Sequence, residues 1–442
     1  MPRCGCASSF WISSKQPLRP SVPFRGGRIR DQTDTLDGSA SLTYRNPMET
    51  VFLKKGEDRR LRIGHLWVFS NEIDTRRSPL SGFTAGQSVL VADAGGRTLG
   101  TGYINPASLI AVRMVSRKPE LPLDADLLRR RLADALALRE TMFSRPFYRL
   151  CHGEGDFLPG LIADRHGDHI VCQITTAGMD VHTETLLGVL DELLHPSSIL
   201  LDNDVASRDL EGLERFQRAA LGDVPEETHV EENDMNYAVS LRGGQKTGWF
   251  YDQRLNRAAL IPFVRSRPGC HVLDAFCYAG GFGALAARHG AGKVSFLDAS
   301  AHALGYARRN AEQFGTETET LQGDALTLLA DLRREGRTFD IVCLDPPAFI
   351  KRKKDARQGL EAYQRVNELG LDLVRPGGML MTCSCSHHLE ADALRNMVTR
   401  AAGKRRRYAR LLRQGFQGPD HPIHPAMPET AYLKTFLFHL PE

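Results

Sequence analysis

The stretch VCLDPPAFIKRKK (residues 342–354), followed by a helical interval and by GGMLMTCSCSHH (residues 377–388), decides the fold. Each half begins with a short apolar run bounded by turn signals, a pattern typical of buried parallel strands. Asp345 ends the first run, and Cys385 follows the second. Because ligands bind beyond the carboxyl ends of the strands in an open parallel sheet, we expect this carboxylate and this thiol to face one pocket.

Strand and helix patterns alternate around this stretch, from about residue 226 to the C-terminus. The predicted strands are 271–276, 293–297, 318–321, 339–344, 379–382, 408–412 and 433–440. Helical patterns separate the first six of them, which predicts an α/β fold with a parallel, doubly wound, Rossmann-like sheet. No helix separates the last two strands, so we expect an antiparallel strand at the end of the chain.

Three further regions precede this domain, which we place at residues 226–442. Residues 1–47 lack apolar periodicity and predict a disordered extension, so that translation could start at Met48. Residues 48–119 contain short β-type runs separated by glycine turns, such as residues 100–102, and predict a small β-barrel. Residues 120–225 predict a central α/β domain, in which Asp124 caps a helix.

The composition excludes several classes of protein. The chain has 442 residues, 42% hydrophobic residues and a net charge of +4, and no apolar run approaches the length of a membrane span. Its nine cysteines are scattered and no secretory signal precedes them, which indicates a reducing, cytoplasmic compartment. Cys383, Cys385 and the neighbouring histidines are too crowded to form a tetrahedral metal site, and no metal is expected.

A basic and aromatic segment, KKGEDRRLRIGHLWVFSNEI (residues 54–73), lies in the first of these domains. Such a mixture can place cations such as Lys54 on phosphates while an aromatic ring such as Trp67 stacks on a base. The alternative interpretation, which we favour for Trp67 itself, is that its ring belongs to the core of the barrel.

A glycine-rich turn lies between a strand and a helix in VLDAFCYAGGFGALAA (residues 272–287), so the helix N-terminus and the turn backbone can approach a ligand. NAD enzymes use similar glycines, and the turn alone is not diagnostic. Four successive strands end near an aspartate: Asp274, Asp298, Asp324 and Asp345. Asp298 lies where a carboxylate can bind a ribose diol, and Asp324 can bind an adenine amino group. Either could cap a helix, but the series predicts a nucleotide-like site.

The sequence resembles a known family at this point. DAFCYAGGFG, FLDAS, GDA and LDPPAF resemble class I S-adenosylmethionine-dependent methyltransferases. More closely, GQKTGWFYDQRLNR, LDPPAFIKRKKD, GGMLMTCSCSHH and PETAYLK resemble the bacterial 23S rRNA cytosine-5 methyltransferases that carry an N-terminal PUA domain. The resemblance extends from about Met48 to the C-terminus. It implies a PUA-like domain at residues 48–119, S-adenosylmethionine as cofactor and large-subunit 23S rRNA as partner, and it leaves a homodimer open.

The resemblance also implies residues that bind the cofactor and the substrate. The implied cofactor-binding residues are Asp252, Arg254, Asp274, Phe276, Tyr278, Ala279, Gly280, Gly281, Asp298, Ala299, Ser300, Asp324, Ala325 and Asp345. The implied substrate-binding residues are Lys54, Trp67, Pro346, Pro347, Phe349, Lys351 and Lys353.

The chemistry that the resemblance implies requires a nucleophilic cysteine. C5 of cytosine is too weak a nucleophile to take a methyl group until a thiolate has added to C6. Counting from Gly378, Cys385 occupies the position of the catalytic cysteine, with Cys383 as the second candidate. Asp345 would hydrogen-bond N3 and the 4-amino group of the ring. The better-known RNA enzymes have a second cysteine after the proline, but Ala348 and its neighbours offer no thiol, so the acceptor of the C5 proton is not assigned.

Two alternative functions remain open from the sequence. An rRNA guanine methyltransferase would share the scaffold without needing a nucleophilic thiol, and replacing Cys385 by alanine should spare it. An RNA-binding assembly factor would keep the cofactor fold without turnover, and it would bind the cofactor without methylating RNA.

Overall fold

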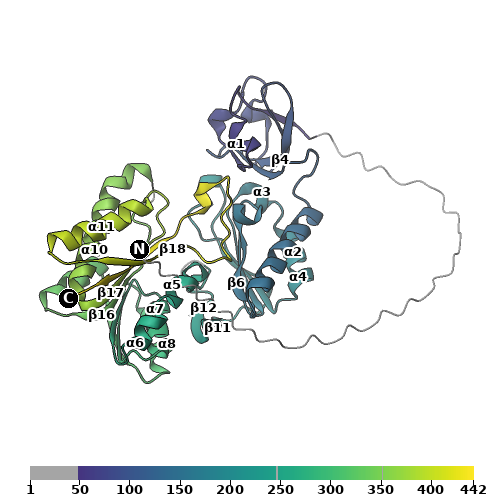
Figure 1. The fold of residues 1–442 in the computed structure, drawn as a ribbon. Helices are drawn as coiled ribbons and strands as arrows, with labels where there is room; N and C mark the ends of the chain where they lie inside the picture. The colour runs from purple at the N-terminus through teal and green to yellow at the C-terminus, as the bar shows by residue number, and fades with distance from the viewer. Residues whose placement is uncertain (1–47, 245–246, 351) are drawn as a thin grey trace, which may run out of the picture. The chain divides into compact units, whose positions relative to one another are not determined.

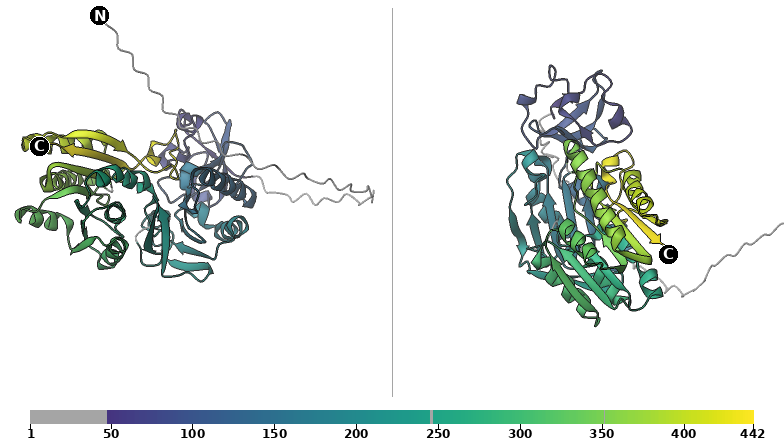
Figure 2. Two further views of the ribbon diagram at one scale, coloured as in Figure 1. Left: turned by 60° about the horizontal axis from the view of Figure 1, so that its bottom comes forward. Right: turned by 90° about the vertical axis from the view of Figure 1, so that its left-hand side faces the viewer.

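The computed structural model describes residues 48–244, 247–350 and 352–442 of the chain. The predictions made for residues 1–47, for Lys351 and for the side chain of Lys353 lie outside this description. Within the described ranges, no helix combines the length and the apolar character that a bilayer span requires. Three sheets and a hairpin follow one another along the chain (Figures 1 and 2).

The first sheet has five strands, β1 (Thr50–Phe52), β2 (Trp67–Val68), β3 (Ser88–Ala92), β4 (Thr98–Ile104) and β5 (Val112–Ser116). Their order is β1-β3-β4-β5-β2, so β1 and β2 lie at the two edges. Alternate apolar residues such as Val89 and Val91 are fully buried in the core beneath it. The predicted β-rich first domain is confirmed, as a single sheet with two edges.

The predicted glycine turn at residues 100–102 is wrong, because these residues lie within β4. A Cβ on Gly100 would lie 2.1 Å from the Ser116 carbonyl oxygen, and one on Gly102 would lie 2.6 Å from the Arg113 carbonyl oxygen. The register between β4 and β5 shifts at Thr101 and Gly102. The glycines therefore allow two strands to approach closely at a bulge and do not end a strand.

The second sheet has the order β10-β9-β8-β7-β6 and is antiparallel except between β8 and β9. Its strands are β6 (Phe147–His152), β7 (Leu161–His166), β8 (His169–Ile174), β9 (Ser198–Asp202) and β10 (Gln217–Gly222). Helices α2 (Ala125–Met142), α3 (Ala177–Asp180) and α4 (Thr183–Leu194) accompany it. Asp124 caps α2 by accepting a hydrogen bond from the Leu127 N–H at 2.9 Å, as predicted.

The third sheet has seven strands in the order β15-β14-β13-β16-β17-β19-β18 and follows the hairpin β11 (Glu227–Glu232) and β12 (Met235–Ser240). The seven strands are β13 (His271–Ala275), β14 (Lys293–Asp298), β15 (Glu317–Gln322), β16 (Phe339–Leu344), β17 (Val374–Ser384), β18 (Arg410–Gly415) and β19 (Lys434–Leu440). The first five pair in parallel, and β19 lies antiparallel between β17 and β18. The α/β alternation and the antiparallel terminal strand are thus confirmed.

Helices cover both faces of this sheet and bury two separate apolar cores. One core contains residues of α6 (Ile261–Ser266), α7 (Gly281–Arg288) and α8 (Ala301–Glu312), and the other those of α9 (Ala325–Arg334), α10 (Ala356–Leu373) and α11 (Ala391–Lys404). Each central strand is buried on both sides, which explains why its sequence is a continuous apolar run.

The segment between β18 and β19, residues 416–433, contacts all three sheets. Met427 is fully buried in the core of the first sheet. Asp420 accepts a hydrogen bond from the Arg149 N–H of β6 at 3.1 Å. Leu433 lies at the carboxyl end of the third sheet, directly before β19. We call residues 416–433 the clasp segment, and the yellow strands β18 and β19 that flank it lie beside the green part of the third sheet in Figure 1.

Candidate active site

A cleft of about 380 Å³ lies at the carboxyl ends of β13, β14, β16 and β17. Its walls come from the glycine turn, from two strand-end aspartates, from the DPPA segment and from the segment after β12. The lining residues are Trp249, Phe250, Asp252, Gln253, Arg257, Phe276, Cys277, Tyr278, Gly281, Phe282, Asp298, Ala299, Asp345, Pro346, Pro347, Ala348, Cys385 and Leu433. Ligands of open α/β sheets bind at this edge, so the cleft is the candidate active site.

The glycine turn is held in a conformation that few residues adopt. Phe276 and Tyr278 have φ angles of 62° and 49°, and Gly280 has a φ of 80°. A Cβ on Gly280 would lie 2.8 Å from the Ala307 Cα, so α8 packs against the bare backbone of the turn. Positive φ at two aromatic residues is costly and concentrates at functional sites. The turn directs Phe276 and Tyr278 toward the cleft.

Asp298 and Asp274 both hold the turn, but only Asp298 lines the cleft. The Asp298 carboxylate accepts hydrogen bonds from the Tyr278 N–H at 3.0 Å and from the Ser300 N–H at 2.9 Å. Asp274 lies behind the turn, where it accepts a hydrogen bond from the Gly283 N–H at 2.8 Å. Burial, together with the charges of Asp345 and Asp298, raises the pKa of Asp274 to about 8. Asp274 therefore supports the first turn of α7 as a largely neutral carboxyl group at pH 7.

Asp345 and Cys385 come from adjacent strands and line the same cleft, as predicted. Asp345 directly follows β16, and Cys385 follows the last residue of β17. Cys383, two residues earlier, is only 1% exposed and belongs to the core on the α7 side of the sheet. Burial raises the pKa of the Cys383 thiol well above its usual value, and the nearby Asp345 adds to this shift. At the end of β17, the thiol of Cys383 is therefore buried, whereas the thiol of Cys385 lies at the cleft.

Buried hydroxyl groups of one tyrosine and two serines connect the segments that follow β16 and β17. Tyr363 of α10 lies 2.8 Å from the Ser386 Oγ and accepts a hydrogen bond from the Ser384 Oγ at 2.9 Å. Its oxygen also lies 3.3 Å from the Pro347 carbonyl oxygen, and the Ser386 Oγ accepts the Ile350 N–H at 3.2 Å. The segments that carry Asp345 and Cys385 are therefore joined through one buried tyrosine.

Several lining residues come from GWFYDQRLNR (residues 248–257), the motif for which the resemblance implied Asp252 and Arg254. Arg257 forms two hydrogen bonds with Glu232, at 2.6 and 2.9 Å, and its guanidinium lies over the Trp249 ring. Both side chains lie against Gly281, where a Cβ would be 3.1 Å from Arg257. The resemblance also placed Gln253 in this motif near the cofactor, and Gln253 lines the cleft. The missed residues Trp249, Phe250 and Arg257 share one signal, which is their place in the same motif.

Some residues that the resemblance implied lie outside the cleft lining. These residues are Arg254, Asp274, Ala279, Gly280, Ser300, Asp324, Ala325, Phe349, Lys54 and Trp67. Asp324 is exposed and caps α9 through the Thr327 N–H at 2.9 Å, and Ser300 caps α8. Arg254 faces the second sheet, where its side chain donates to the Phe147 carbonyl.

Two of these residues belong to the part of the chain that contains the first sheet, where Trp67 lies on β2 and Lys54 follows β1. The half-buried Trp67 packs against the core there and donates from Nε1 to Glu154 at 2.8 Å, which agrees with the core interpretation. The exposed Lys54 donates to the Asn71 carbonyl at 2.7 Å.

Comparisons with known proteins agree with this geometry. Residues 51–117 match the PUA-like domain family, and residues 218–439 match the S-adenosylmethionine-dependent methyltransferase family. A crystal structure, complexed with SAH, of a protein assigned as a methyltransferase covers 89% of this chain and 100% of its own, with a TM-score of 0.75 and 20% identity. A structure of an assigned SAM-dependent methyltransferase from Streptococcus mutans has a TM-score of 0.74, 20% identity and the same coverage. These two structures show the fold.

Curated relatives are considerably more similar in sequence. The ribosomal RNA large subunit methyltransferase I of Tolumonas auensis is 36% identical over 393 residues, which cover 87% of this chain and 98% of the relative. The protein of the same name from Shewanella amazonensis is 38% identical over 392 residues, with 87% and 97% covered. S-adenosylmethionine is accordingly the cofactor of this enzyme. The chain belongs to the ribosomal RNA large subunit methyltransferase I family of S-adenosylmethionine-dependent methyltransferases.

Proposed function

We propose that the protein transfers a methyl group from S-adenosylmethionine to C5 of a cytosine in 23S rRNA, through a covalent bond between Cys385 and C6. The observation that carries the proposal is the presence of a thiol and a carboxylate in one cleft, at the ends of adjacent strands, next to the glycine turn. The names of the relatives supply the large-subunit rRNA as substrate. A guanine methyltransferase would have no use for the thiol.

Cys385 is the better nucleophile of the two cysteines near the end of β17. It is partly exposed and lines the cleft, whereas Cys383 is buried and its pKa is raised. The Sγ of Cys385 forms a bond to C6, and the electrons of the C5–C6 double bond move toward C5 and N3. C5 can then take the methyl group. Loss of the C5 proton returns its electron pair to the ring, which expels the thiolate.

Asp345 orients the ring during these steps. It follows β16 directly, and its N–H lies 3.3 Å from the Ala275 carbonyl oxygen, so its backbone is held against β13. A carboxyl group there can bond to N3 and the 4-amino group of cytosine, where charge changes as the adduct forms. Pro346 and Pro347, which line the same wall, limit the space around the base.

The residues present fit S-adenosylmethionine. Asp298 lies at the end of β14, where a carboxylate reaches a ribose diol, and Phe250, Phe276 and Phe282 supply apolar surface for an adenine ring. The bare backbone at Gly280 and Gly281 lets the N-terminus of α7 lie against the cleft. When bound, the cofactor supplies an electrophilic methyl group. We assign Tyr278 and Ala299 to the walls around it, and Ala279, Ser300 and Asp274 to the support of these walls from outside the cleft.

The remaining predictions concern RNA, domains and location. We propose that residues 48–119 bind RNA through basic side chains such as Lys54, that Lys351 and Lys353 bind phosphates, and that the chain divides further into domains at residues 120–225 and 226–442. The rRNA substrate and the seven free cysteines of the described residues support a reducing cytoplasm. We also propose that the protein can form a homodimer, which measurement of its mass by sedimentation velocity would test.

The decisive test measures product and adduct together. We expect 5-methylcytidine in 23S rRNA by nucleoside mass spectrometry with the wild-type enzyme, none with Cys385→Ala, and retained methylation with Cys383→Ala. RNA with 5-fluorocytosine at the target has no C5 proton to lose, so it should remain bonded to the wild-type enzyme in denaturing gels. Methylated guanine, or full activity of Cys385→Ala, would overturn the proposal.

A further inference from the structure

Lys434, the first residue of β19, brings an ammonium group to the segment that carries Cys385. In the antiparallel ladder Lys434 pairs with Ser384, the residue before Cys385. Its Nζ donates to the carbonyl oxygen of Ser386, the residue after Cys385, at 2.7 Å, and to that of Tyr432 at 3.0 Å. The backbone of Lys434 thus lies beside the residue before the nucleophile, and its side chain contacts the residue after it.

Glu390 and Cys385 lie near enough to this ammonium group to affect its pKa. Lys434 is half-buried, and burial lowers its pKa, while the neighbouring Glu390 and Cys385 act to raise it. Glu390 lies exposed at the start of α11, whereas Cys385 lines the cleft. A negative charge on Cys385 would therefore form beside a cation.

Several other titratable groups surround Cys385, and one of them, Arg257, is a cation that lines the same cleft but is paired with the buried Glu232. Burial raises the pKa of Tyr363, from α10, and of Tyr432, from the clasp segment. Burial lowers the pKa of His387, and His388 and Lys434 lower it further. Asp345 and Asp252 line the same cleft and disfavour a second negative charge. Lys434 is therefore the cation whose hydrogen bonds place it next to the segment that carries Cys385.

We propose that Lys434 is a positioning residue for the nucleophile, whose ammonium group stabilises the Cys385 thiolate and holds the backbone at Ser386, directly after it. Nearby lysine side chains favour the thiolate form of a cysteine, which is the form that attacks an electrophile. The two carbonyl contacts fix the ammonium group where that charge forms. The inference rests on the proposed role of Cys385 and adds the group that activates it.

The test measures the pH dependence of Cys385 alkylation by iodoacetamide in the full-length protein, read at the Cys385 peptide by mass spectrometry. We expect the midpoint to rise by about one pH unit in Lys434→Met and in Lys434→Gln, which still donates hydrogen bonds. Lys434→Arg should keep the wild-type midpoint. Lys293→Met is the matched control, because Lys293 pairs with Glu317 at 2.5 Å at the opposite end of the same sheet.

The limiting alkylation rate at high pH distinguishes an effect of the Lys434 charge on the thiolate from a structural disturbance around Cys385. If Lys434 acts by charge, this rate stays near the wild-type value in all variants and only the midpoint moves. An unchanged midpoint in Lys434→Gln and Lys434→Met, or an equal shift in Lys434→Arg, would overturn the inference while leaving the role of Cys385 intact. Failure of the proposed function has a different signature, which is cytosine methylation by Cys385→Ala.

Discussion

The Tyr363 hydroxyl lies 2.8 Å from the Ser386 Oγ, and this contact joins the ends of two adjacent strands of the third sheet. Through the same oxygen, Tyr363 reaches Ser384 at 2.9 Å and the Pro347 carbonyl at 3.3 Å. α10 therefore fixes the distance between the segment after β16, which carries Asp345, and the segment after β17, which carries Cys385.

Tyr363→Phe should separate these two segments without emptying the core. Removing the hydroxyl takes away the acceptor of the Ser384 hydroxyl and one partner of the Ser386 hydroxyl, so we expect a loss of about 1–2 kcal/mol in the free energy of unfolding. Misplacement of the two reacting groups should lower kcat roughly tenfold with little change in cofactor affinity. Urea unfolding and steady-state kinetics measure the two effects. Tyr408→Phe is the control, since Tyr408 is 78% exposed, and equal kinetics of both variants would contradict the role of Tyr363.

Gly280→Ala should weaken cofactor binding through the backbone of the turn. Gly280 has a φ of 80°, and a Cβ there would lie 2.8 Å from the Ala307 Cα, so α8 or the turn must move. We expect cofactor affinity, measured by calorimetry, to fall by at least roughly tenfold.

Gly269→Ala separates backbone strain from the clash. Gly269 has a nearly equal φ of 78°, but a Cβ there meets nothing within 4 Å. This variant should lose about 1 kcal/mol of stability and keep its affinity for the cofactor. Equal losses of affinity in both variants would show that packing against α8 is not the cause.

Asp274 should make the protein less stable as the pH rises toward 8. Burial raises its pKa from 3.8 in the unfolded chain to about 8 in the folded protein. The folded state therefore keeps a proton that the unfolded state has lost, and the free energy of unfolding falls by up to about 1.4 kcal/mol per pH unit across this window. The contribution is complete below pH 4 and is lost as the pH passes through 8.

Asp274→Asn imitates the protonated carboxyl group and should flatten this dependence. We expect the variant to gain stability relative to the wild type at pH 8 and to differ little at pH 4, as measured by urea unfolding at each pH. Asp324→Asn is the comparison, because Asp324 is exposed and its capping contacts lower its pKa. A parallel pH dependence in the wild type and Asp274→Asn would contradict a neutral Asp274.

The sequence was sufficient for the third sheet because its buried parallel strands are continuous apolar runs. Residues 339–344, for example, form a strand with the predicted bounds. The same reasoning missed two strands of the second sheet, because it assigned no strand to the residues that form β6 and β7. Arg149 and Asp164 face each other across these strands at 2.5 Å and are buried. A buried ion pair interrupts the apolar pattern that reveals a strand.

The residues of the cleft that lie at strand ends could be predicted from the sequence. Those that come from the segment before α6 could not be predicted from topology. Asp298, Asp345 and Cys385 lie at strand ends, so topology alone brings them to one edge. Trp249 and Arg257 reach the cleft only because Glu232, on β11, holds both side chains, at 3.1 Å from the Trp249 Nε1 and 2.6 Å from the Arg257 Nε. No local pattern encodes such a contact.

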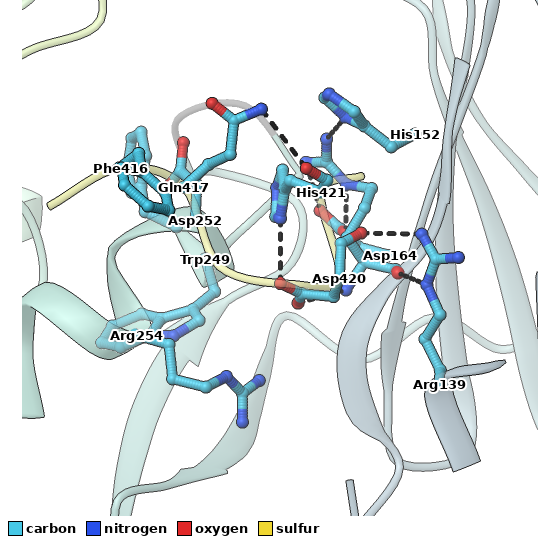
Figure 3. A network of polar contacts seen from close by, with 12 residues as sticks. Arg139, His152, Asp164, Trp249, Asp252, Arg254, Phe416, Gln417, Asp420 and His421 are labelled. Atoms are coloured by element: carbon cyan, nitrogen blue, oxygen red, sulfur yellow. Dashed lines mark hydrogen bonds and ion pairs between the residues drawn. The ribbon is translucent and has the colours of Figure 1, made fainter. Parts of the chain in front are cut away.

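Arg139 anchors the clasp segment to the second sheet, and its loss should destabilise the protein strongly. The buried guanidinium binds both carboxylate oxygens of Asp156, at 2.6 and 2.7 Å. It also donates to the carbonyl of Asp420 at 2.7 Å, and Figure 3 shows Arg139 and Asp420. Arg139→Met would leave the Asp156 carboxylate buried without its cation, so we expect a loss of about 3–5 kcal/mol in the free energy of unfolding. Arg215→Met, which removes an exposed pair with Asp209, is the control and should change the free energy of unfolding little.

The anchor should also matter for catalysis, because the clasp segment leads from Asp420 directly to Tyr432 and Lys434. Asp420 also accepts a hydrogen bond from the Arg149 N–H at 3.1 Å, so Arg139 and Arg149 both hold the segment near its start. If Arg139 fixes the clasp, Arg139→Met assayed well below its unfolding temperature should show a lower kcat and a raised midpoint for Cys385 alkylation. A variant that is destabilised but keeps the wild-type midpoint would limit Arg139 to stability, because Lys434 would then hold its place without the anchor.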